Sequence, residues 1–129
     1  NSLSDAFIRL KVSGLKDIPH HMELLTNAIA KFGGSDEELD LATLAVQQMA
    51  SKGVISMEEL RRQFAERVPG AIQAFADAAN KTYAEFTKQV ATGKMEWSEF
   101  VVYYLEGMKK FLGGNKLMMR TFTGMRKFL

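Results

Sequence analysis

The chain has 129 residues, of which 47% are hydrophobic, so it is long enough for one domain with a buried core. It contains no cysteine, which excludes disulfides and thiolate metal sites. No apolar run approaches the roughly 18 residues of a membrane span, and there is no signal-peptide pattern. Because the chain begins with Asn1 rather than Met, we expect it to be a fragment of a longer protein.

The net charge of +2 is unevenly distributed along the chain. All 15 acidic residues lie at or before Glu106, which leaves residues 1–106 with a net charge of −4. The six cations beyond that point are Lys109, Lys110, Lys116, Arg120, Arg126 and Lys127. Such a segment is typical of a solvated basic helix, but it would also suit contact with an acidic partner surface, a membrane face or nucleic acid.

Apolar residues recur at helical spacing over three early segments, residues 3–13, 18–32 and 36–51. Pro19 lies in the first turn of the second segment, where its missing N–H is tolerated. The third segment begins with a capping box, Ser35–Glu38, whose side chains satisfy free backbone N–H groups. In this segment we expect Leu39, Ala42, Val46 and Met49 to be buried, and Asp36, Asp40, Thr43 and Gln47 to face solvent.

The next stretch is expected to connect two packed helices. Lys52 and Gly53 supply a helix stop, namely a cation in the last turn followed by a residue that adopts positive φ without penalty. Ser56 and Glu59 are the two ends of another capping box, which predicts that a new helix begins at Ser56. The apolar residues that follow share one face of that helix: Met57, Leu60, Phe64 and Val68.

Turn residues also mark the remaining helices. Pro69 disfavours helical geometry at the residue before it, and its fixed φ suits the first turn of the next helix, residues 71–79. Thr82–Glu85 is a further capping box, and Gly93 is expected to end the helix that it begins. The most apolar helix is expected over residues 96–112.

These patterns predict an all-α fold, a compact bundle of about seven or eight short helices with Gly-marked turns and no sheet. We expect a helical body over residues 1–112, followed by a basic amphipathic helix over residues 113–129 that begins with a Gly-Gly linker. Methionines and cations in that last segment predict a surface that repacks against partners. Its candidate interaction residues are Lys116, Met119, Arg120, Phe122, Met125, Arg126 and Lys127.

One internal repeat is present. Residues 53–60 align with residues 93–100, 40 positions further on. The apolar positions Met57, Leu60, Phe64 and Val68 then correspond to Trp97, Phe100, Tyr104 and Met108. Either the two helix–turn–helix units are related, or the same turn occurs twice; two units are too few for a solenoid.

No pattern of catalytic or cofactor-binding residues is found. His20 and His21 are neighbours and point about 100° apart on a helix, so they cannot chelate a metal together, and we expect them at the surface or at a helix cap. No Ser has a His at a plausible motif spacing, and the Gly pairs belong to no phosphate-binding motif. We therefore expect no enzyme activity, no metal, no cofactor and no small-molecule substrate.

A helix-turn-helix DNA-binding regulator is the alternative interpretation. Residues 74–85 have the sequence pattern expected of this motif, with a small-residue helix, a turn near Asn80 and a second helix. That second helix offers only Glu85, Lys88 and Gln89 to base edges. Because the body of the domain is acidic, its affinity for phosphates is expected to be poor.

Four segments follow one another in a characteristic order along the chain: Gln48–Gly53, Ser56–Gln63, Val68–Ala71 and Trp97–Phe100. With them, about residues 25–112 resemble the tape measure domain of tail tape measure proteins from tailed phages and prophages. The departures are small: Ala79-Asn80 stands where a Gly is common, and Phe64 where Leu is common. The run of matches in order is specific, whereas any one segment alone would be weak.

The resemblance implies a structural, non-enzymatic role. Proteins of this family are long helical chains around which tail tube subunits polymerise, so that chain length sets tail length. The implied partners are tail tube subunits, tail assembly chaperones and further copies of the chain. The implied location is the bacterial cytoplasm during assembly and then the virion tail. Some tape measure proteins resemble peptidoglycan hydrolases in a separate region, so a lysin-type domain is a further alternative.

Overall fold

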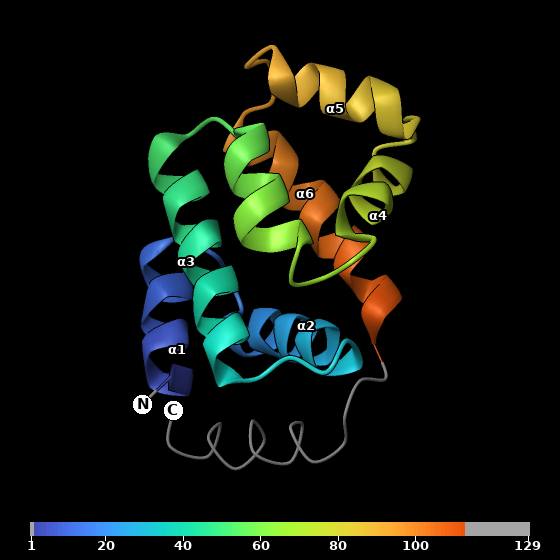
Figure 1. Cartoon of the computed structure of the whole chain (residues 1–129). Helices are drawn as coiled ribbons and strands as arrows, with labels where there is room; N and C mark the ends of the chain where they lie inside the picture. Colours follow the sequence, from blue (N-terminus) through green and yellow to red (C-terminus); the bar gives the residue numbers. More distant parts are fainter. Residues whose placement is uncertain (1, 113–129) are drawn as a thin grey trace.

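The computed structural model describes residues 2–112, and the candidate interaction residues between Lys116 and Lys127 lie outside them. The described chain forms eight helical elements in the order α1 (Ser2–Val12), α2 (Ile18–Lys31), α3 (Asp36–Lys52), η1 (Glu59–Ala65), α4 (Ala71–Ala78), α5 (Tyr83–Ala91), α6 (Trp97–Met108) and η2 (Lys109–Phe111). The prediction of an all-α bundle is confirmed (Figure 1). Within residues 2–112 the only strand-like pairing is an isolated bridge between Val54 and Glu96.

The bundle is arranged around α3 and α6. Helix α1 packs along α3, and α4 packs across α6, while α5 lies at the end of the body opposite α2 (Figure 1). Gly107 allows the close approach of α6 to α4, because a Cβ at this position would lie 2.8 Å from the Phe75 ring and 3.0 Å from the Ala74 backbone. The small-residue helix α4 thus serves as a close-packing surface.

Four aromatic side chains form the centre of the core. Phe64, Phe75, Phe100 and Tyr104 come from η1, α4 and α6, and their ring centroids are 5.3–6.1 Å apart in five contacting pairs. All four are at most 1% exposed. Edge-to-face and offset contacts of this kind add about 0.5–1.5 kcal/mol each to the burial of the rings. The cluster therefore joins η1, α4 and α6 to one another.

Two expectations about helix faces are wrong. Thr43 on α3 is fully buried, and Asp40 is half-buried and forms an ion pair with Arg9 of α1. Both residues were expected to face solvent, but α1 packs against this side of α3. The expected buried residues Leu39, Ala42, Val46 and Met49 are all in the core.

The helix expected to begin at Ser56 also differs from a regular α-helix. The chain is helical from Met57, but η1 is a π-helix, with the Glu66 N–H donating to the Arg61 carbonyl five residues earlier at 3.1 Å. The wider turn still leaves Leu60, Phe64 and Val68 buried. Wide turns of this kind occur mostly as single insertions in α-helices.

Candidate interaction surface

The two predicted glycine stops have the same backbone conformation. Gly53 ends α3 with φ 76°, and Gly93 follows α5 with φ 72°. Their N–H groups donate to the carbonyls of Met49 and Val90, at 3.1 and 3.0 Å. Positive φ is strained for residues with a Cβ. The backbone conformation by itself therefore favours glycine at both positions.

The capping box expected at Ser56 is only half formed. The Glu59 N–H donates to the Ser56 Oγ at 3.3 Å, as expected. The Glu59 carboxylate does not reach back to the Ser56 N–H; instead it is buried and forms an ion pair with Lys52 at the end of α3. The prediction for Glu59 is therefore corrected: this carboxylate holds α3 to η1 rather than capping its own helix.

Pro69 lies before the helix that it was expected to begin. The Ala71 N–H donates to the Val68 carbonyl at 3.0 Å, and Gly70 has φ 87° and ψ 0°. These values describe a type II turn with Pro69 at its second position, where proline is favoured. Helix α4 begins only at Ala71, and Pro69 remains exposed.

The expectation that both histidines lie at the surface or a cap is wrong for His21. Its side chain is only 3% exposed, and its ring stacks on that of Tyr104 with centroids 6.2 Å apart. Burial is the main cause that lowers the pKa of His21 to about 4, and the nearby His20 lowers it further. His21 is thus a neutral core residue at ordinary pH, and Tyr104, whose pKa is raised by burial, lies against it.

The side chains that a DNA-reading helix would need are engaged within the body. Glu85 accepts from the Thr82 N–H at 2.9 Å in a complete capping box. Gln89 donates to Glu99 of α6 at 3.1 Å and also contacts Lys81. Of the three candidates on α5, only Lys88 has an exposed side chain that forms no hydrogen bond or ion pair with the described residues. The geometry therefore does not favour the DNA-binding interpretation.

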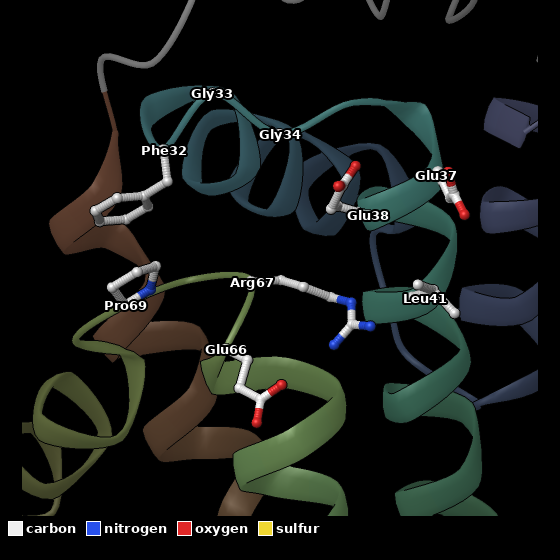
Figure 2. Close-up of a pocket in the computed structure, with 9 residues that line it drawn as sticks. All are labelled: Phe32, Gly33, Gly34, Glu37, Glu38, Leu41, Glu66, Arg67 and Pro69. Carbon is white, nitrogen blue, oxygen red and sulfur yellow. The ribbon is translucent and has the colours of Figure 1, made fainter.

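A pocket of about 530 Å³ lies between the α2–α3 connection and the turn after η1. Figure 2 shows Phe32 and Pro69 at one end and the Arg67 side chain reaching toward Glu38 on α3. We call it the α2–α3 pocket; it is lined by Phe32, Gly33, Gly34, Glu37, Glu38, Leu41, Glu66, Arg67 and Pro69. Three carboxylates and one guanidinium give it a negative balance of charge. Sequence reasoning missed it, because it brings together residues about 30 positions apart.

The described residues show neither a metal-type cluster nor a membrane span. No group of three or more His, Asp or Glu side chains within residues 2–112 is arranged to hold an ion. Over the same range, no helix has the length and apolar character needed to cross a bilayer.

Comparison with known proteins identifies the family. The family model described as "Tape measure protein" matches residues 1–129. A protein of Salmonella phage Felix O1 described as a probable tape measure protein is 40% identical over 97 residues, which cover 72% of this chain and 13% of that protein. The chain thus spans about an eighth of the length of that relative, and no solved structure matches it. Because the family model matches the whole chain, the chain belongs to the tape measure protein family.

Proposed function

We propose that this chain is a compact helical body within a phage or prophage tail tape measure protein, and that it acts in tail assembly through protein–protein contacts. The observation that supports the proposal is the family match over all 129 residues. The described residues agree with it in one respect: the conspicuous polar groups are used in caps, ion pairs and the core. The proposed contacts are with tail tube subunits, tail assembly chaperones or further copies of the chain, in the cytoplasm and then in the virion tail.

The compact fold bears on how this segment would contribute to tail length. A continuous α-helix of 111 residues would be about 165 Å long, at about 1.5 Å per residue. A folded domain of this size has a radius of gyration of only about 13 Å. We therefore propose that the body serves as a docking module on the longer chain, and that most of the length is set by other parts of the protein.

The test is a deletion of residues 2–112 from the tape measure gene of a phage that encodes this chain. The matched control removes the same number of residues from a continuous helical stretch elsewhere in the same protein. Electron microscopy of the progeny would measure tail number and length. We expect the body deletion to abolish tail formation, or to shorten tails by well under 165 Å, whereas the control shortens them by about 165 Å.

Two outcomes would contradict the proposal. A body deletion that shortens tails as much as the control does would mean that this segment is extended in the tail. Unchanged tail number, tail length and infectivity would remove any role in assembly. A separate turbidity assay on purified cell walls tests the proposal that the segment is structural, because lysis by the purified chain would assign it an enzymatic activity.

A further inference from the structure

We propose that the α2–α3 pocket is the docking site for this chain's own basic segment, residues 113–129. The inference concerns the isolated chain and does not rest on the proposed role in tail assembly. This pocket has an acidic rim and exposed apolar side chains, and it lies next to the point where the described chain ends.

The acidic rim carries free charge. Glu37 and Glu66 line the pocket and are exposed, and neither side chain forms a hydrogen bond or ion pair with any residue between 2 and 112. Glu38 is already bound at the start of α3, where it accepts from the Ser35 N–H at 2.9 Å. Carboxylates left unpaired in a concave surface attract cations more strongly than the same groups on a convex one.

Arg67, the single cation that lines the pocket, already interacts with other residues of the folded body. The Arg67 Nη1 donates to the Arg62 carbonyl at 2.6 Å. Its guanidinium also lies close enough to Glu38 to contribute to the lowered pKa of that carboxyl, behind the hydrogen bonds from Ser35. Arg67 therefore neutralises part of the charge of Glu38 and leaves Glu37 and Glu66 for an incoming cation.

The basic segment has the complementary sequence. Residues 113–129 contain four cations, Lys116, Arg120, Arg126 and Lys127, and no acidic residue. They also contain apolar residues such as Phe122 and Met125, which suit the apolar end of the pocket formed by Phe32 and Pro69. The cations and apolar residues of the basic segment thus complement the carboxylates and apolar residues of the pocket.

The connection is short. The ring of Phe111, at the end of η2, lies 5.9 Å from the ring of Phe32, which lines the pocket. Only three residues separate Leu112 from Lys116, and they can span about 10 Å. A short tether gives an effective concentration in the millimolar range, so a weak attraction is sufficient for docking. A second copy of the chain would bind without this advantage.

The absence of cysteine allows a clean cross-linking test in the full chain. The test pair is Pro69→Cys with Thr123→Cys, which joins the exposed rim of the pocket to the basic segment. A second pair, Leu41→Cys with Thr123→Cys, probes the α3 wall of the pocket and guards against a disturbed turn at residue 69. The matched control is Thr92→Cys with Thr123→Cys, because Thr92 is exposed at the end of α5, far from the pocket.

Disulfide formation under mild oxidant is followed by non-reducing electrophoresis and intact mass. We expect the intramolecular disulfide to form at least about tenfold faster in both pocket pairs than in the control pair. Adding Glu37→Lys and Glu66→Lys to the first pair should slow disulfide formation several-fold, because the rim would then repel the cations of the basic segment. Raising the salt concentration to about 1 M should also slow it several-fold, because exposed charges are screened. Circular dichroism verifies that each variant is folded.

Three results would overturn the proposal. Equal rates in the pocket and control pairs would mean that the segment has no preferred site on the body. Cross-linking that is mainly between two chains, and that increases with protein concentration, would assign the pocket to a second copy. Rates that are insensitive to both the charge reversal and salt would remove the electrostatic basis of docking.

Discussion

The turn at Gly53 and the turn at Gly93 have related sequences and lie against each other in the fold. The Ile55 N–H donates to the Met95 carbonyl at 2.9 Å, and the Trp97 N–H donates to the Gly53 carbonyl at 2.9 Å. Ile55 and Met95, which are equivalent in the repeat, are both buried. The internal repeat in the sequence therefore corresponds to two turns that pair through their backbones.

The apolar positions of the two units are equivalent, whereas a polar position is not. Leu60 and Phe100, Phe64 and Tyr104, and Val68 and Met108 are all buried. Glu59 is buried and paired with Lys52 of α3, but its equivalent Glu99 is half-buried and accepts from Gln89 of α5 and Tyr103 of α6. Apolar spacing thus determines which residues enter the core, while the neighbouring helix determines what each carboxylate does.

The largest expected effect tests the equivalence of the two core positions. We expect Phe64→Ala and Tyr104→Ala each to lower the free energy of unfolding by about 3–5 kcal/mol, because each removes a buried ring and leaves a cavity in the aromatic cluster. Urea denaturation measures both. Val102→Ala on the exposed side of α6 is the control and should change it by under about 0.5 kcal/mol. A small effect in one unit only would show that the two helices do not share the core.

The second prediction uses a contact that only one unit has. His21 stacks on Tyr104, whereas the rings that lie against Phe64 within residues 2–112 are those of Phe75 and Tyr104. The pKa of His21 is about 4 in the folded protein and about 6.5 when unfolded, so the unfolded state takes up a proton first. Stability should therefore be full above about pH 6.5 and fall by about 2 kcal/mol toward pH 4, allowing for partial screening by solvent.

This pH dependence is measured by urea denaturation at a series of pH values. His21→Phe should remove most of the slope between pH 6.5 and 4, because it replaces the titrating ring by an apolar one of similar shape. The matched control is His20→Gln, which should retain most of the slope, because burial rather than His20 is the main cause of the lowered pKa of His21. An unchanged slope in His21→Phe would show that the loss of stability arises from other groups.

The third prediction compares the two glycines. A Cβ added at Gly53 or at Gly93 would meet no atom within 4 Å, so alanine should cost only the strain of positive φ, about 1–2 kcal/mol at each position. Asparagine tolerates this conformation better and should cost less than alanine at both. Thermal melting of the four variants would measure this. A much larger loss at one glycine would show that this turn also depends on a close contact.

The sequence predicts those features of this structure that depend on neighbouring residues, and it does not predict those that depend on packing between distant segments. Helix stops at Gly53 and Gly93 depend on local backbone chemistry, and buried faces depend on apolar spacing, so both can be found by pattern. The roles of Asp40, His21 and Glu59 depend on which distant helix packs against them, and a single sequence does not reveal that. The same holds for the α2–α3 pocket, whose walls are far apart in the chain.

The smallest expected effect compares a complete capping box with an incomplete one. At the start of α5, Thr82 accepts from the Glu85 N–H at 3.1 Å, and Glu85 accepts from the Thr82 N–H at 2.9 Å. At Ser56 only the first of these bonds is present, and at 3.3 Å it is longer. We therefore expect Thr82→Ala to cost about 1 kcal/mol and Ser56→Ala about 0.5 kcal/mol, measured by urea denaturation at pH 7.

Lowering the pH should reduce the difference between the stability penalties of Thr82→Ala and Ser56→Ala. The hydrogen bond from the Thr82 N–H is the main cause that lowers the pKa of Glu85 in the folded protein, and the Thr82 side chain, which Thr82→Ala removes, lowers it further. Such a carboxylate stabilises the fold above its unfolded pKa, and the contribution is lost as pH falls through the folded value. Glu59 makes no such bond to Ser56, so the penalty of Ser56→Ala should change less with pH. Equal penalties at pH 7 would mean that the return bond from the glutamate adds nothing, and the cap would then depend on the hydroxyl alone.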